Sequence, residues 1–180
     1  MNKEGVYMTW FFMGLAIVPM LIMTLGRTAL SWSQNHLFQT DYLLYATLSG
    51  IMSTFLIRSF QHNRKDRMMF RIVWNIRQRH WNRLTALLFA CVMFFGVNHD
   101  GLIGALHLVF TGIAIISAYI GMVWYYQVRT VMGHGAILGA ACGVLGFLFA
   151  YLTPFLTTAE GEMIAAIPIT IYVFSTTKID

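Results

Sequence analysis

The side chains best suited to acid–base chemistry or metal binding are a few histidines and carboxylates beside long apolar runs. They are Asp41, His99, Asp100, His107 and Glu160. Imidazole and carboxylate groups can transfer protons or hold zinc when they converge. His107 stands out, because it lies about two turns inside an apolar run. An ionisable side chain at that depth of a membrane helix is a functional candidate.

The spacing of these residues does not define a metal site or a catalytic pair. His99 and His107 are eight residues apart, which places them about 80° apart around a helix. The carboxylates also suit helix N-termini, where negative charge is favourable. Three interpretations stay open for these groups: helix caps in solvated loops, which are favoured, an outward-facing site for a lipid headgroup or a substrate, and a metal site. No Walker, Rossmann, GxSxG or HExxH motif occurs in the chain, so a protein without its own chemistry is favoured.

No metal or haem is expected. A transmembrane haem needs two histidines at matching depth on facing helices, whereas His107 and His134 lie near opposite ends of their predicted spans. Cys91 and Cys142 each lie inside an apolar run, without a CxxC or Cys/His spacing. Lipid is the small molecule that the chain is expected to bind.

The composition indicates which kind of fold positions these residues. The chain has 180 residues, of which 58% are hydrophobic and 11% charged, and its mean hydropathy is +0.65. A soluble domain has about a quarter of its residues charged, so too few charges are present to cover a surface in water. We predict an all-α, polytopic membrane protein with a single transmembrane domain over residues 1–180.

Six apolar runs are long enough, or nearly so, to cross the hydrocarbon core as helices of about 20 residues. The predicted spans cover residues 8–26, 42–60, 84–97, 102–126, 135–153 and 163–176. They define a six-transmembrane-helix bundle.

The distribution of positive charge predicts the orientation of this bundle. Eight of the twelve lysines and arginines lie between Arg58 and Arg83. Because cytoplasmic loops collect lysine and arginine, the loop at 61–83 should be cytoplasmic, and both termini then lie on the same side. That arrangement leaves only Arg27 outside. The net charge of +5 is thus a signal of topology, and no nucleic acid partner is expected.

The basic loop also carries a helical pattern. Met69, Ile72, Val73 and Ile76 follow the spacing of one helix face. This predicts an interfacial amphipathic helix between the second and third spans, lying flat on the membrane. The cations expected to contact anionic lipid headgroups are Arg64, Lys65, Arg67, Arg71, Arg77 and Arg79. A plain topological anchor is the alternative.

The fifth span contains a small-residue motif. Gly135, Gly139 and Gly143 recur every fourth residue. Small residues at that spacing allow membrane helices to approach closely, so we predict that this face packs against another helix, either within the bundle or in a homo-oligomer.

Three stretches follow the pattern of a known membrane protein family. Leu106-His107 precedes a small-residue segment at 111–114, Ala159-Glu160 precedes the last span, and a polar segment from Ser31 leads into a span ending at Ile57-Arg58. In these features the chain resembles the DRAM family (damage-regulated autophagy modulators), which is grouped with the FGF-receptor-activating proteins. The resemblance implies six spans, a lipid-linked or non-catalytic role, and an outer polar pair of His107 and Glu160.

These observations lead to three functional hypotheses. The first is a lipid-associated integral membrane protein that organises or senses lipids or partner membrane proteins. The second is a membrane enzyme or lipid-remodelling factor with an outward-facing His/Asp/Glu site. The third is a small accessory subunit of a respiratory or photosynthetic complex.

Overall fold

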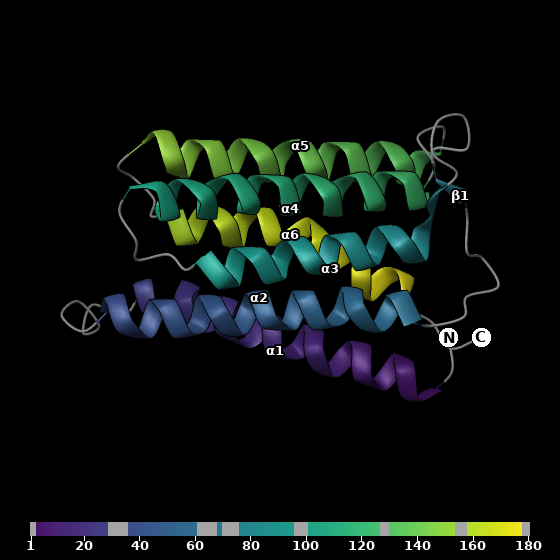
Figure 1. Cartoon of the computed structure of the whole chain (residues 1–180), viewed down its shortest axis with the longest axis horizontal. Helices are drawn as coiled ribbons and strands as arrows, with labels where there is room; N and C mark the ends of the chain where they lie inside the picture. Colours follow the sequence, from purple (N-terminus) through teal and green to yellow (C-terminus); the bar gives the residue numbers. More distant parts are fainter. Residues whose placement is uncertain are drawn as a thin grey trace.

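The fold is described from a computed structural model. It covers residues 3–28, 36–60, 68–69, 76–95, 101–126, 130–153 and 158–177, with side chains for most of them. Six helices make up nearly all of this part of the chain and lie side by side along the long axis of the molecule (Figure 1). The helices are α1 (Lys3–Thr28), α2 (His36–Phe60), α3 (Gln78–Phe95), α4 (Leu102–Tyr126), α5 (Val131–Leu152) and α6 (Thr158–Thr176). The all-α fold class is thereby confirmed.

All successive helices are neighbours in space. α1 packs on α2, α2 on α3, α3 on α4 and α5 on α6, and α4 makes a smaller contact with α5. α6 differs, because it also contacts α4, α1 and α2. This central helix therefore brings the end of the sequence against segments from its beginning and middle.

The two ends of the bundle differ in their polar groups. α1 begins and α6 ends at the end that carries β1 (Figure 1). Arg58, near the end of α2, is 2.8 Å from the hydroxyl of Thr176 at the end of α6. We call this the basic end. The opposite end, where α3 finishes and α4 and α6 begin, is called the His107 end.

The core forms where helix faces with apolar spacing meet. On α6 the buried side chains Ala165, Ala166, Ile169, Tyr172 and Val173 recur every three or four residues, as one helix face requires. The buried core residues on the other helices include Met13 and Ala16 of α1, Ile51 and Phe55 of α2, Phe89 and Val92 of α3, and Ala114 and Ala118 of α4.

The outward faces of several helices are apolar as well. Val109 and Ile116 on α4 are 54% and 52% exposed, and Leu138 and Leu145 on α5 are 66% and 65% exposed. Helices that are apolar all round are typical of large cores or of membrane spans. Among the described residues, two helices, Leu102–Tyr126 and Val131–Ala150, are long and apolar enough to cross a membrane, and Gly161–Thr176 is a shorter apolar helix.

The basic loop differs from the amphipathic helix expected there. Met68–Met69 (β1) pairs antiparallel with Ile76–Arg77 (β2), with Met69 opposite Ile76. The prediction of a helix over residues 69–76 is therefore wrong at Met69 and at Ile76, which both lie in strands. A helix of only eight residues is marginal, because forming its first turn costs more free energy than its few backbone hydrogen bonds return. The β1–β2 strand pair, by contrast, is held in place because β2 continues directly into α3. Residues 61–67 and 70–75 lie outside the described residues.

The glycines of α5 differ in their surroundings. A Cβ at Gly139 would lie 3.6 Å from Cβ of Pro168 on α6, and a Cβ at Gly143 would overlap the hydroxyl of Tyr119 on α4. At Gly135, by contrast, no described atom lies within 4 Å of that position. Gly139 and Gly143 thus lie at the contacts of α5 with α6 and α4, and Gly135 lies beyond them.

Candidate functional site

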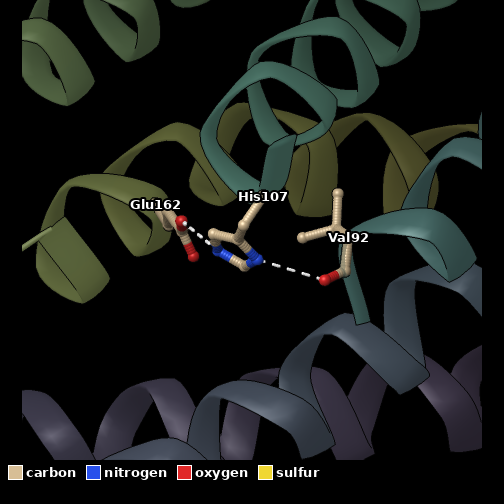
Figure 2. A network of polar contacts seen from close by, with 3 residues as sticks. All are labelled: Val92, His107 and Glu162. Atoms are coloured by element: carbon tan, nitrogen blue, oxygen red, sulfur yellow. Dashed lines mark hydrogen bonds and ion pairs between the residues drawn. The ribbon is translucent and has the colours of Figure 1, made fainter. Parts of the chain in front are cut away.

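His107 and Glu162 meet in the interior of the bundle (Figure 2). His107 Nε2 is 3.4 Å from Glu162 Oε1, and both side chains are 4% exposed. The other ring nitrogen, Nδ1, lies 3.1 Å from the backbone carbonyl oxygen of Val92. One buried imidazole therefore connects α4 to both α3 and α6.

The ends of the helices explain why these groups are available. Val92 lies in the last turn of α3, where a carbonyl has no amide partner within its own helix. α4 begins directly after Gly101, whose φ of 75° is a conformation that glycine adopts without strain. The Gly101 carbonyl accepts a hydrogen bond from the amide of Ala105 at 3.1 Å. This start places His107 in the second turn of α4, beside the end of α3.

A small cavity adjoins the Glu162 carboxylate. Its volume is about 20 Å³, which is room for one water molecule. The polar residues that line it are Thr47, Thr111 and Glu162. Leu48, Ile51, Phe89, Ile115, Met163, Ala166 and Ile169 form the rest of the wall. The Thr111 hydroxyl and both Glu162 oxygens are buried without a hydrogen-bond partner among the described residues.

The structure brings one of the five predicted acid–base candidates into a defined site. That residue is His107, and its carboxylate partner is Glu162. His99 and Asp100 lie outside the described residues, and the side chains of Asp41 and Glu160 are likewise not described. Whether these four converge on His107 therefore stays a prediction.

Glu162 is the site residue that sequence reasoning missed. It lies close to Glu160 in a polar stretch before an apolar run, where a carboxylate also suits a helix N-terminus. Glu162 lies on the same helix face as Ala165 and Ala166, three and four residues further on, and both of these are buried. The sequence alone did not distinguish this face from the one that carries Glu160.

A second buried polar group lies at the basic end. Arg58 is 8% exposed and donates from Nη1 to the hydroxyls of Thr176 at 2.8 Å and Thr177 at 3.4 Å. Its guanidinium carbon lies 5.1 Å from the ring centre of Tyr172. The Tyr172 hydroxyl accepts a hydrogen bond from Gln78 Nε2 at 3.2 Å. Arg58 thus joins α2 to the end of α6, although sequence reasoning counted it only as a topological charge.

The predicted headgroup-binding cations are described only in part. Arg77 is exposed and Arg79 is half-buried at the start of α3, whereas Arg64, Lys65, Arg67 and Arg71 lie outside the described residues. Arg83, one turn further along α3, is exposed and its guanidinium carbon lies 5.1 Å from the ring centre of Phe60. The described part of the basic end therefore presents two arginines outward, Arg77 and Arg83.

Two further observations bear on the class of site. Within the described ranges, no three His, Cys, Asp or Glu side chains gather in a way that could hold a metal ion. Comparisons with protein-family models, with curated proteins and with solved structures find no match to this chain. The features of the molecule that indicate a function are therefore its two buried polar groups and its apolar outer faces.

Proposed function

We propose that the chain is a multi-pass integral membrane protein whose six helices all span the bilayer. The observation that carries this proposal is the exposure of large apolar side chains on the outward faces, while His107, Glu162 and Arg58 are buried inside. In water this distribution would be unfavourable, because contiguous exposed apolar surface drives association. In lipid it is the expected one, since polar groups must find partners within the bundle.

The proposed orientation places the basic end in the cytoplasm. Arg77 ends β2, and Arg79 and Arg83 lie in the first two turns of α3. The start of α1 and the end of α6 lie at the same end of the bundle (Figure 1). Lysine and arginine near membrane helix ends favour the cytoplasmic side. The His107 end then faces the opposite compartment.

Extraction of membranes tests this proposal directly. Alkaline carbonate removes peripheral proteins but leaves integral ones in the pelleted bilayer. We expect the full chain to stay in the pellet after carbonate and to enter solution only with detergent. Recovery of folded protein in the carbonate supernatant would contradict the proposal.

The proposed role is association with lipids, with anionic headgroups at the basic end. The outward arginines Arg77 and Arg83 are exposed there, and each cation near an anionic leaflet contributes about 1 kcal/mol of attraction. Arg64, Lys65, Arg67 and Arg71 would add to the same surface. Organising or sensing lipids, or partner membrane proteins, is the function that this arrangement supports best, in keeping with the resemblance to the DRAM family.

Thermal unfolding in detergent measures the lipid association. Phosphatidylglycerol should raise the Tm of the purified chain more than phosphatidylcholine does, because only the former adds negative charge. The double variant Arg67→Glu and Arg71→Glu should lose that difference. Arg27→Glu, on the opposite side by the proposed topology, is the matched control and should keep it. Equal effects of both lipids on the unmodified chain would contradict anionic lipid binding.

A lipid-remodelling enzyme with an outward-facing site is the second candidate. The contact between His107 and Glu162 favours it, because an imidazole beside a carboxylate is a common acid–base pair. Cells expressing the unmodified chain should then differ in lipid composition from cells expressing Glu162→Gln at equal abundance. Identical lipid profiles of the two cell lines by mass spectrometry would contradict the enzyme hypothesis and favour the non-catalytic role.

A further inference from the structure

The tautomer of His107 follows from its contact with Val92. A backbone carbonyl oxygen can only accept a hydrogen bond, so the nitrogen 3.1 Å from it, Nδ1, must carry a hydrogen and donate. In a neutral imidazole the other nitrogen then has a lone pair and no hydrogen. That nitrogen, Nε2, is the one that faces Glu162 Oε1 at 3.4 Å.

Two acceptors thus face each other unless a proton lies between them. An ionised carboxylate and the lone pair of a neutral Nε2 repel, whereas one added proton gives either an imidazolium beside a carboxylate or a carboxylic acid beside an imidazole. We propose that His107 and Glu162 form a proton-binding site in the bundle interior, in which the two side chains share one added proton.

The surroundings make this added proton important. Without it the site holds one buried carboxylate whose charge is not compensated, which is strongly unfavourable in an apolar interior. With it the pair is neutral overall. The described residues of α2 and α3 that line the site do not titrate: Thr47, Leu48, Ile51, Phe89 and Val92. The other lining residues of α4 and α6 do not titrate either: Thr111, Ile115, Met163, Ala166 and Ile169. Within the described residues, His107 and Glu162 are therefore each other's only titratable neighbours at this site.

The interior described around the pair offers the carboxylate little other compensation. The cavity beside Glu162 has room for about one water molecule, but its wall is almost entirely apolar. The Thr111 hydroxyl and both Glu162 oxygens are buried without a hydrogen-bond partner among the described residues. The Glu162 carboxylate therefore depends on His107 and the shared proton. This proposal goes beyond the lipid association and needs only the folded bundle.

Infrared difference spectroscopy tests the site in the full chain, reconstituted in phosphatidylcholine nanodiscs and cycled between acid and alkaline buffer. We expect a protonated-carboxyl band that shifts in D2O and is lost in Glu162→Gln. In His107→Gln the midpoint of that band should move by about one pH unit or more, a tenfold change in proton affinity. A band that keeps its midpoint without His107 would overturn the shared site.

Matched controls separate this site from its neighbours. Glu160→Gln, on the same helix, should keep the band, and its loss there would overturn the assignment. Because Glu162→Gln could fail to fold, ¹³C-labelled glutamate in the unmodified chain gives a second measurement: the band must shift with the label, and an unshifted band overturns the proposal. Sodium added at constant pH should leave the band unchanged, whereas its loss would assign the site to a metal cation instead.

Discussion

At the scale of single residues, two buried polar groups connect helices that are far apart in the sequence. His107 joins α4 to α3 and α6 at one end of the bundle, and Arg58 joins α2 to α6 at the other. In an apolar interior each group is tolerated because its partner is present. Removal of one partner leaves the other buried and unpaired, which is far more unfavourable than removal of both.

The contact between His107 and Glu162 should therefore show strong coupling. His107→Ala or Glu162→Ala alone should each lower the free energy of unfolding by about 3–5 kcal/mol. The double variant should lose clearly less than the sum of the two. Unfolding in a denaturing detergent series measures all four proteins, and strictly additive losses would show that the two side chains do not interact.

Arg58 should matter more to stability than an exposed arginine of the same end. Arg58→Ala removes hydrogen bonds from a charged donor, each contributing about 1.5–3 kcal/mol. Arg83→Ala removes an exposed cation over Phe60, for which about 0.5–1 kcal/mol is expected. The Tm of Arg58→Ala should thus fall well below that of Arg83→Ala. Equal Tm values would mean that Arg58 does not hold α6 in place.

At the scale of secondary structure elements, the length of each apolar run was sufficient to predict the helices. All six predicted spans fall on helices of the structure within its described residues. Local patterns were not sufficient elsewhere. Met69 and Ile76 fit the spacing of one helix face, yet they pair with each other in two short antiparallel strands. The spacing of apolar residues within a segment does not show whether its two ends can pair as strands instead.

The partner of His107 was unpredictable for a related reason. His107 could be singled out from its depth in an apolar run, which is a local property. Its contact with Glu162 depends on how α6 crosses α4, and no spacing within the sequence encodes that crossing. The neighbouring Glu160 was an equally good candidate until the rotation of α6 was known.

The glycines of α5 give a test of helix packing at this scale. Gly143→Ala places a methyl group onto the Tyr119 hydroxyl, so α5 must move and the Tm should fall, with about 1–3 kcal/mol lost to overpacking. Gly135→Ala meets open space and should be neutral or slightly stabilising, because alanine favours helix. Circular dichroism melts compare the two. A larger fall in Tm for Gly135→Ala than for Gly143→Ala would mean that α5 packs against its neighbours through the stretch around Gly135.

At the scale of the whole molecule, the apolar outer faces and the basic end lead to one proposed arrangement. In it the bundle lies across the membrane, with its basic end in the cytoplasm and its His107 end on the opposite side. The proposed lipid association then occurs at the cytoplasmic end, and the proposed proton-binding pair lies nearer the opposite end.

Labelling of single cysteines measures this orientation most directly. In a background with Cys91→Ser and Cys142→Ser, cysteines are introduced at exposed positions of the His107 end, Leu102→Cys and Leu152→Cys, and of the basic end, Arg77→Cys and Val131→Cys. A membrane-impermeant maleimide should label the first two in intact cells and all four after permeabilisation. Labelling of Arg77→Cys or Val131→Cys in intact cells, as fast as Leu102→Cys, would contradict the six-span, cytoplasmic-termini arrangement.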